Sequence, residues 1–324
     1  MSKALGLLSG GLDSSLATLC LKRQGIDVTA IAFITPFFGS NKAEHAARQM
    51  GIPLIVEDIG RTHLDMVKNP RYGYGKNMNP CIDCHAMMFR LAGEAMAEGG
   101  FDFLFSGEVL GQRPMSQNAN ALRSVANYSG HPDRILRPLS ARLLPITPME
   151  EQELVDREQL LDIQGRSRKR QETYAREWGL ADFPSSGGGC LLTEIHFSDR
   201  LRDLFNHQPD CMVSDIELLK IGRQFRLSEQ AKLTLGRHQQ DNEAIRAAAD
   251  DSHVVLRVLD VSGPLGLVSG EPLEEDLRAA GAIVASYGKS KEQREVVVLA
   301  ETPDGEQRFS LAPMPRSESE KLIV

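Results

Sequence analysis

The chain has 324 residues, of which 41% are hydrophobic and 25% are charged, a composition typical of a soluble globular protein that is long enough for two domains. A net charge of −7 argues against nonspecific coating of nucleic acid, although it leaves room for a local basic patch. With no apolar run of about 18 residues and no secretory leader at its N-terminus, the sequence predicts a cytoplasmic protein with no membrane partner.

The first predicted strand, residues 4–8, leads through a glycine turn into a helix that begins near residue 15. Glycines allow backbone N–H groups to approach an anion, and a helix N-terminus adds about half a positive charge. The segment therefore predicts a phosphate site. It matches neither the G-x-x-x-x-G-K-[ST] loop nor the dinucleotide fingerprint, which needs a third glycine.

Residues 9–15 resemble the SGGxDS signature of the PP-loop ATP pyrophosphatases, with Ser9, Gly10, Gly11, Leu12, Asp13, Ser14 and Ser15 at the motif positions. The resemblance implies an enzyme that cleaves ATP between its α and β phosphates and releases pyrophosphate. It also implies that these residues bind ATP, that Mg²⁺ neutralises the pyrophosphate, and that Asp13 contacts the metal or the substrate. The alternative is an ordinary glycine-rich turn between a strand and a helix.

Four further strands are predicted at 28–33, 53–59, 101–105 and 135–139, and they alternate with helices such as 40–50 and 86–100. This alternation predicts an α/β fold, here a PP-loop parallel sheet with helices on both faces. Ligands of such sheets lie beyond the carboxyl ends of the strands. Phe33 lies at one of these ends and suits either an adenine ring or plain core packing, and at another the backbone of Gly107 can approach the nucleotide.

Polar and basic segments follow these strands. Residues 61–79 show no periodicity and are predicted as a long loop that is either functional or disordered. Helices are predicted at 150–163 and 167–178, and the second begins with a basic cluster that is either a solvated face or a contact for an RNA backbone. The predicted contacts for RNA phosphate are Arg113, Lys169 and Arg170.

Three of the five cysteines are predicted to form one site. Cys81 and Cys84 bracket two residues, so both sulfurs can point at one ion, and Cys190 follows a glycine-rich segment. The residues alone leave four kinds of site open. They are a structural zinc that also uses His85, a thioredoxin-like redox pair, an iron–sulfur cluster with one open iron, and catalytic thiols without a metal.

The segments NPCIDCHAMMF, FLFSGE and GGGCLL resemble those of the tRNA thiouridine synthetases within the PP-loop group. This group includes the 2-thiouridylases and the three-cysteine tRNA thiolases, whose cysteines hold a [4Fe-4S] cluster. The resemblance covers residues 1 to about 205 and implies ATP-dependent thiolation of tRNA. It implies that Asp13, Cys84 and Cys190 are catalytic and that Cys81, Cys84 and Cys190 bind the cluster.

In the implied reaction, a uridine oxygen attacks the α-phosphate of ATP and becomes part of an adenylate, which later leaves as AMP. A sulfide on the open iron, or a persulfide on Cys190 or Cys84, then attacks the activated carbon. The sulfur donor is therefore expected to be sulfide or a persulfide carrier, and a homodimer is compatible with the sequence.

A change in composition near 207–213 predicts a first domain over 1–208 and a small α+β domain over 213–324. Residues 215–300 bear a weak resemblance to the NFACT-type RNA-binding domain. Three modules of related enzymes are expected to be absent, namely the N-terminal tRNA-binding modules of the 4-thiouridine enzymes, a rhodanese-like domain and the β-barrel tail of the 2-thiouridylases.

Two other functions stay open. One is a PP-loop amide-forming or nitrogen-transfer synthetase that acts on a small molecule and holds zinc with its cysteines. The other is an RNA-binding protein that keeps the nucleotide fold without turnover. Pyrophosphate release that is stimulated by unmodified tRNA would exclude both.

Overall fold

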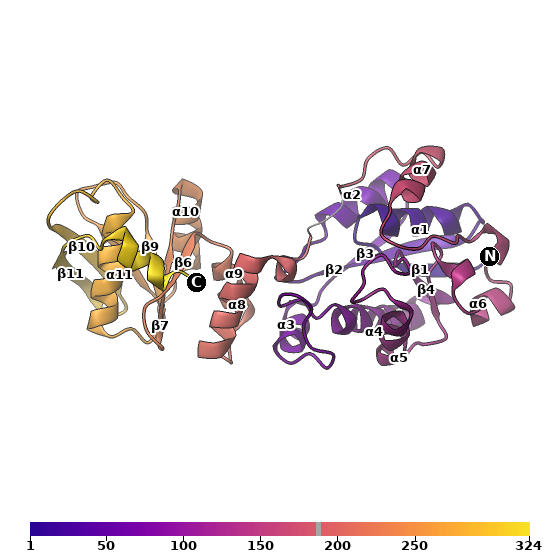
Figure 1. Cartoon of the computed structure of the whole chain (residues 1–324), viewed down its shortest axis with the longest axis horizontal. Helices are drawn as coiled ribbons and strands as arrows, with labels where there is room; N and C mark the ends of the chain where they lie inside the picture. The colour runs from indigo at the N-terminus through magenta and orange to yellow at the C-terminus, as the bar shows by residue number, and fades with distance from the viewer. Residues whose placement is uncertain (186–188) are drawn as a thin grey trace. The chain divides into compact units, whose positions relative to one another are not determined.

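The computed structural model describes residues 1–185 and 189–324, which separate into two compact units, Met1–Thr193 and Glu194–Val324 (Figure 1). Each unit has its own sheet. Helix α8 (Ile195–His207), which the sequence analysis assigned to the first domain, belongs to the second unit. Part of the predicted glycine-rich segment before Cys190, residues 186–188, lies outside the described residues.

The first unit is built on a five-stranded parallel sheet in the order β3-β2-β1-β4-β5. Its strands are β1 (Lys3–Leu7), β2 (Asp27–Ile34), β3 (Leu54–Asp58), β4 (Phe103–Ser106) and β5 (Ile135–Leu136). Strand β1 is central, and its Leu5 lies opposite Thr29 of β2 on one side and Leu104 of β4 on the other. Because the strands are parallel, the segments that follow β1, β2 and β4 leave the same edge. The predicted parallel α/β sheet is confirmed.

Helices cover both faces of this sheet (Figure 1). One face packs against α1 (Leu12–Lys22), α2 (Asn41–Met50) and α7 (Lys169–Glu177), and the other packs against α4 (Cys81–Gly99) and α5 (Ala119–Ser129). Ala4, Ala30 and Phe105 point to the first face, whereas Leu5 and Leu104 point to the second. Successive strand residues alternate between faces, so the continuous apolar runs are what a doubly covered sheet requires.

The predicted loop 61–79 is in part wrong, because its first half is the helix α3 (Gly60–Lys68). The buried face of α3 includes His63 together with Leu64 and Val67. The polar residue His63 interrupts the apolar pattern of the buried face. The N-cap residue, Ile59, has no polar side chain that would mark the start of the helix. The helix therefore leaves only a weak signal in the sequence.

The helix predicted at 150–163 is also wrong. Helix α6 (Pro148–Glu151) is a single turn, and the 3₁₀ turn η2 (Arg157–Gln159) follows it. Between them, Glu153 has a φ of 55°, which lies in the left-handed region and cannot continue a right-handed helix.

The second unit carries a six-stranded antiparallel sheet in the order β11-β10-β8-β9-β7-β6. Its strands are β6 (Arg223–Arg226), β7 (Ala231–Leu235), β8 (Val254–Val258), β9 (Gly266–Gly270), β10 (Val296–Thr302) and β11 (Gly305–Leu311), and its further helices are α9 (Val213–Leu219), α10 (Gln239–Ala248), α11 (Glu274–Ser286) and α12 (Arg316–Ser319). Leu277, Ala280 and Val284 of α11 pack into the core of this sheet. Strand β11 escaped prediction because Phe309 is its one buried residue, which leaves no apolar alternation.

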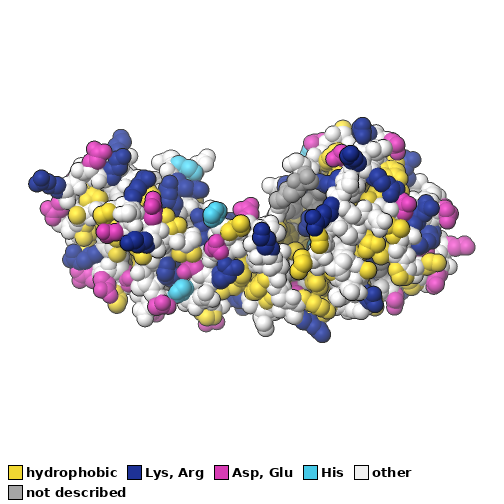
Figure 2. Space-filling view, viewed as in Figure 1, with side chains coloured by type: hydrophobic (Ala, Val, Ile, Leu, Met, Phe, Trp, Pro, Cys, Tyr) yellow, Lys and Arg dark blue, Asp and Glu magenta, His cyan; other side chains and the backbone are white. Residues whose placement is uncertain are grey.

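The surface of the second unit carries charges of both signs. Figure 2 shows Lys and Arg side chains interspersed with Asp and Glu side chains over this unit, rather than one broad basic face. In the part of the chain that the structure describes, no helix is both long enough and apolar enough to cross a membrane.

Candidate active site

The predicted phosphate loop, residues 9–15, connects β1 to α1 at the carboxyl edge of the parallel sheet. Gly10 has a φ of 73°, and a Cβ at this position would lie 2.2 Å from the backbone of Lys42, so a side chain does not fit here. Gly11 caps α1 without a side-chain hydrogen bond, while Oγ of Ser14 donates to the Gly11 carbonyl (2.9 Å) and lies 3.2 Å from Oγ of Ser9. The first N–H groups of α1 thus keep their capacity to bind an anion.

Asp13, in the first turn of α1, meets two residues from distant parts of the chain. Its Oδ2 accepts a hydrogen bond from Nε2 of Gln112 (2.9 Å) and lies 3.6 Å from a guanidinium nitrogen of Arg168. Among the described residues, Oδ1 of Asp13, Oε1 of Gln112 and Nε of Arg168 are buried without a hydrogen-bond partner. Since buried polar atoms normally have partners, this cluster has the character of a binding site.

The same cluster fits Mg²⁺. Mg²⁺ in nucleotide sites is held by one or two carboxylates together with phosphate oxygens. The buried Oδ1 of Asp13 has no partner in the described part of the chain and lies in the first turn after the phosphate loop. Asp13 is therefore the residue that would hold the ion.

Gly107, just after β4, lies against this loop. A Cβ on Gly107 would lie 2.4 Å from the backbone nitrogen of Ser14 and 2.5 Å from the carbonyl carbon of Asp13. The sequence predicted that the backbone of Gly107 approaches the nucleotide. In the structure, Gly107 lies close to the backbone of the phosphate loop. Gly107 thus sets the position of the loop against β4.

Gly107→Ala should weaken ATP binding at least tenfold, because the clashing atoms of the loop are backbone atoms that cannot rotate away. Overpacking of this kind also costs about 1–3 kcal/mol of stability. Calorimetric titration with ATP and thermal unfolding followed by Trp178, the one tryptophan of the chain, would measure both effects. Gly39→Ala is the matched control, since nothing lies within 4 Å of a Cβ at Gly39. Equal ATP affinity in both variants would contradict the prediction.

Cys81 and Cys84 lie in the first turn of α4, which begins at Cys81 and not after the motif as predicted. Nδ2 of Asn79 lies 3.3 Å from Sγ of Cys81, and Nε2 of His63 lies 3.2 Å from Sγ of Cys84. His63 is fully buried, and this burial lowers its pKa to about 4. The imidazole is therefore neutral at pH 7 and can accept a hydrogen bond from the Cys84 thiol.

The residues after Cys190 dock beside this turn. The backbone N–H of Leu191 donates to the carbonyl of Phe37 (3.1 Å), just after β2, and the ring of Phe37 lies 5.5 Å from that of His63. The carbonyl of Thr193 accepts a hydrogen bond from Nδ2 of Asn77 (2.6 Å) in the loop that leads to α4. These contacts draw the segment of Cys190 to the carboxyl edge of the sheet.

The three predicted cysteines are neighbours. Burial raises the pKa of Cys84 well above its ordinary value, and the charges of Cys190, Cys81 and Asp83 raise it further. Such an influence needs short separations. Cys190, about a hundred residues further along the chain, thus lies close enough to the C-x-x-C turn for its charge to act on Cys84, and the single site of three cysteines stays a prediction.

The donors do not fit a metal ion. Among residues 1–185 and 189–324, no three His, Cys, Asp or Glu side chains have a geometry that could hold one. Metal ligation also requires thiolates, whereas burial favours the protonated form of Cys84. Neither the predicted zinc site nor the predicted [4Fe-4S] cluster finds support in this arrangement, and both stay predictions.

A buried charge network centred on Glu108 contacts the residue that follows Cys84. Oε1 of Glu108 lies 2.7 Å from Nδ1 of His85, which follows Cys84, and Oε2 accepts from Nε of Arg137 (2.9 Å). Burial raises the pKa of Glu108, but Arg137 and His85 outweigh this effect and lower it to about 2. Gly107 packs against the predicted phosphate loop and the next residue, Glu108, holds His85, so a short path of contacts leads from this loop to the residue after Cys84.

Glu108→Gln should destabilise the first unit at neutral pH and change its acid sensitivity. A glutamate titrates near 4.5 in the unfolded chain and at about 2 here. The charge therefore contributes fully above pH 4.5, and its contribution is lost as the pH falls from 4.5 to about 2. The difference corresponds to on the order of 3 kcal/mol.

Urea unfolding at pH 7 and at pH 3, followed by the fluorescence of Trp178, would measure this change. Glu94→Gln is the control, because Glu94 pairs with Arg90 at the surface. Wild-type and Glu108→Gln proteins should differ strongly at pH 7 and much less at pH 3. Equal stability at pH 7 would refute the assigned role of Glu108.

The other predicted site residues lie as follows. Phe33 is 4% exposed and packs in the core below α4, which is the second of the two interpretations that the sequence left open. Arg113 lines a cavity that also includes Cys81. Lys169 is exposed at the start of α7, and the guanidinium of Arg170 pairs with Asp162 at 2.5 Å.

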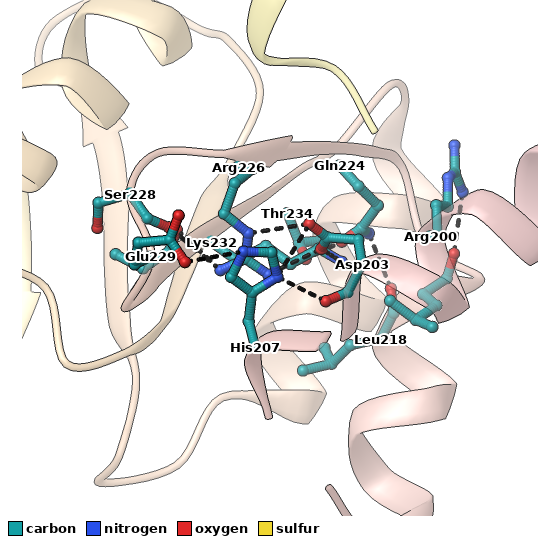
Figure 3. A network of polar contacts seen from close by, with 12 residues as sticks. Arg200, Asp203, His207, Leu218, Gln224, Arg226, Ser228, Glu229, Lys232 and Thr234 are labelled. Carbon is teal, nitrogen blue, oxygen red and sulfur yellow. Dashed lines mark hydrogen bonds and ion pairs between the residues drawn. The ribbon is translucent and has the colours of Figure 1, made fainter. Parts of the chain in front are cut away.

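The second unit has a polar network of its own (Figure 3). Asp203 of α8 accepts two hydrogen bonds from Arg226 (3.0 and 2.7 Å) and one from Lys232 (3.1 Å), and Nδ1 of His207 lies 3.5 Å away. Burial lowers the pKa of Lys232 to about 8, against the opposing influence of Asp203. One carboxylate thus ties α8 to β6 and β7 of this unit.

Sequence reasoning missed several residues of the first unit's site, namely His63, Asp83, Gln112, Arg137 and Arg168. Asp83 lies inside the C-x-x-C motif and Arg168 in the predicted basic cluster, but neither was recognised as a site residue, and no motif marks His63 or Arg137. One weak signal was available, because Gln112 lies in a polar segment just after the strand that ends at Gly107. His63 carried none, since its helix was not recognised.

Comparison with known families gives two matches. Residues 1–142 match the family described as thiamine biosynthesis protein (ThiI), and residues 222–323 match the NFACT protein RNA binding domain. The two resemblances drawn from the sequence, to tRNA thiouridine synthetases and to an NFACT-type domain, are thereby confirmed. Cys190 lies beyond the first matched segment.

Similar curated proteins include a probable tRNA sulfurtransferase of Staphylococcus aureus strain MRSA252, which is 30% identical over 144 residues. The match covers 42% of this chain and 34% of that relative, and the same values hold for the probable tRNA sulfurtransferase of strain Newman. The chain thus spans about a third of the length of the curated relatives that it matches.

Two solved structures show weaker similarity. One is a 4-thiouridine synthetase in complex with RNA and bound ATP, with 22% identity and a TM-score of 0.41 over 67% of this chain and 52% of that one. The other is the C-terminal part of a fibronectin/fibrinogen-binding protein from Streptococcus suis, with 9% identity and a TM-score of 0.30 over 49% of this chain and 79% of that one.

Proposed function

We propose that the protein is an ATP-dependent tRNA sulfurtransferase that adenylates a uridine oxygen and replaces it with sulfur. One observation carries the proposal, namely the path of contacts from the phosphate loop through Gly107 and Glu108 to His85, the residue that follows Cys84 in the chain. A site that combines a nucleotide loop with several thiols suits activation of an oxygen followed by attack of sulfur. The similarity of residues 1–142 to tRNA sulfurtransferases supports the same chemistry.

In the first step, the uridine oxygen attacks the α-phosphorus of ATP, the bond between the α-phosphorus and the bridging oxygen breaks, and pyrophosphate leaves. The N–H groups at the start of α1 bind the pyrophosphate, and Ser9 and Ser14 offer hydroxyls beside them. Mg²⁺, when bound, neutralises the charge that develops on the phosphates. Asp13 would hold it, while Gln112 and Arg168 orient the carboxylate.

In the second step, sulfur replaces the activated oxygen. The terminal sulfur of a persulfide on one cysteine attacks the carbon, and AMP leaves with the oxygen. A second thiolate then attacks the sulfur of the first cysteine, so that a disulfide forms and the thiocarbonyl is released. Two cysteines are oxidised by this step, and an external thiol must reduce the disulfide before the next cycle. With sulfide as donor the attack is direct and no disulfide forms.

The neutral His63 suits this second step. Its Nε2 lies 3.2 Å from Sγ of Cys84, and its low pKa keeps the nitrogen unprotonated at pH 7. It can therefore accept a hydrogen bond from the Cys84 thiol and orient its sulfur, while the low pKa of His63 and the raised pKa of Cys84 oppose transfer of the proton between them. This assigns a positioning role to a residue that has no recognisable motif in the sequence.

The predicted [4Fe-4S] cluster is tested separately. Protein purified without oxygen would be assayed for iron and acid-labile sulfide and compared with Cys190→Ala. Four irons and four sulfides in the wild type, lost in the variant, would establish the cluster. Zinc alone, bound equally well by the variant, would refute it.

The proposed function is tested by pyrophosphate release from ATP, with and without unmodified tRNA. We expect release to depend on tRNA and to be followed by formation of thiouridine when sulfide or a persulfide is supplied. A small-molecule synthetase would release pyrophosphate with ammonia and an acid and would not need RNA. A binding protein without turnover would release none in either case.

A further inference from the structure

A cavity of about 250 Å³ opens beside the cysteine turn of the first unit. Its wall includes Tyr72, Tyr74, Cys81, Arg113, Met115 and Thr193. The volume lies just below the roughly 300 Å³ at which pockets for small ligands usually begin. It therefore suits a single nucleoside better than a larger ligand such as ATP.

Two connections relate the cavity to the reacting groups. Cys81, one of the three thiols, lies in its wall, and Thr193 is hydrogen-bonded to the carbonyl of Cys190 through both its backbone N–H (3.1 Å) and its hydroxyl (2.7 Å). Gln112 binds Asp13 of the phosphate loop (2.9 Å), while the next residue, Arg113, lines the cavity. A group bound in the cavity would therefore lie next to Cys81 on one side. On another side it would lie next to Arg113, whose neighbour Gln112 is bonded to the phosphate loop.

Aromatic and cationic side chains cluster at the cavity. Tyr72 is 43% exposed and Tyr128 is 41% exposed, and their ring centroids lie 5.8 Å apart. The guanidinium carbon of Arg71 lies 5.0 Å from the Tyr128 ring and 5.9 Å from the Tyr72 ring. No acidic residue contributes to the described cavity wall, where Arg113 carries a positive charge. Exposed rings and a planar guanidinium are the groups on which unstacked RNA bases are held.

The cluster is held in place by the C-x-x-C turn itself. Asp83, which lies between the two cysteines and is 1% exposed, accepts hydrogen bonds from the backbone N–H groups of Arg71 (2.9 Å) and Tyr72 (3.1 Å). The hydroxyl of Tyr74 donates to the carbonyl of Val67 (2.6 Å). A buried carboxylate therefore fixes the aromatic residues relative to the thiols.

We infer that this cavity takes the uridine that receives the sulfur, turned out of its stack in the RNA, and that Arg71, Tyr72 and Tyr128 stack on a neighbouring base. The inference rests on the proposed function, because that function makes a uridine the acceptor. It goes beyond that function by naming the residues that hold the acceptor. It also explains why the loop between α3 and α4 is long, since this loop carries Tyr72 and Tyr74. Arg113 neutralises a phosphate of the same nucleotide segment.

The test compares Tyr72→Ala and Tyr128→Ala with Tyr72→Phe and Tyr128→Phe, which keep the rings. Pyrophosphate release would be measured as a function of an unmodified tRNA transcript and of ATP, and affinity for pentauridylate would be measured by fluorescence anisotropy. The alanine variants should lose roughly tenfold or more in kcat/KM for tRNA and in pentauridylate affinity. The KM for ATP should not change, the phenylalanine variants should stay within about twofold of wild type, and thermal unfolding would confirm that all four fold.

The outcomes separate the two proposals. If wild type turns over with tRNA and the alanine variants match it in both assays, the acceptor site is refuted and the sulfurtransferase proposal stands. If wild type does not turn over with tRNA, the proposed function fails, and the pentauridylate assay alone decides whether this surface binds RNA. If the alanine variants slow only sulfur transfer from a protein persulfide and not from sulfide, the surface binds a protein donor and the inference is wrong.

Discussion

Cys84→Ser should abolish thiolation of tRNA while ATP activation continues. Serine keeps the size of the side chain and can still hydrogen-bond to His63, but it cannot carry a persulfide or resolve one. Removal of a covalent group of this kind costs on the order of a thousandfold or more in turnover. The contact of the Cys84 sulfur that the structure gives is with His63, whereas the phosphate loop packs against Gly107. Adenylation therefore has no reason to fail.

The measurement is a parallel assay of tRNA-dependent pyrophosphate release and of thiouridine formation, with a persulfide as the sulfur donor. Cys20→Ser is the matched control. Cys20 is 2% exposed in the apolar core around α1, and its thiol donates a hydrogen bond to the carbonyl of Gln159 (3.6 Å). The control should keep both activities. Thiouridine formation by Cys84→Ser at the wild-type rate would remove the C-x-x-C turn from the mechanism.

Asp13→Asn should have the opposite pattern, with loss of pyrophosphate release and hence of every later step. The amide preserves the shape of the side chain but removes the negative charge beside Arg168 and the orphaned oxygen that fits Mg²⁺. Loss of one preorganised electrostatic group in an active site costs about 10²–10³ in turnover. We expect a fall of about a hundredfold or more.

The decisive assay is pyrophosphate release at saturating ATP over a series of Mg²⁺ concentrations. The wild type should saturate with Mg²⁺, whereas Asp13→Asn should stay slow or need much more of the ion. Asp162→Asn is the control, because Asp162 pairs with Arg170 at the surface. Turnover of Asp13→Asn within a few-fold of wild type at all Mg²⁺ concentrations would show that Asp13 serves neither the ion nor the phosphates.

Much of the first unit could be predicted because its signals are local. Residues 9–15 form the phosphate loop from one continuous segment, and the apolar runs at β1, β2 and β4 report directly that the sheet is buried on both faces. The spacing of Cys81 and Cys84 likewise predicts that both cysteines lie on one turn. Such features depend on neighbours in the sequence, so reading the chain in order finds them.

What the sequence concealed depends on contacts between distant segments. His63 reaches Cys84 from a helix whose buried face is partly polar, and Gln112 and Arg168 reach Asp13 from segments about 100 and 155 residues away. Asp83 reads as a spacer between two cysteines, but in the fold it holds the backbone of Arg71 and Tyr72. A polar residue that works through tertiary contacts has no periodicity and no fixed spacing, so the chain alone does not reveal it.

The central claim is that one edge of the parallel sheet joins ATP activation to sulfur transfer. It is tested most directly by incubating unmodified tRNA with the protein, ATP, Mg²⁺ and a persulfide donor whose outer sulfur is ³⁴S, and then analysing the tRNA nucleosides by mass spectrometry. The account predicts a labelled thiouridine that requires ATP and disappears in both Asp13→Asn and Cys84→Ser. Pyrophosphate release from the same mixture without any thiouridine would contradict it.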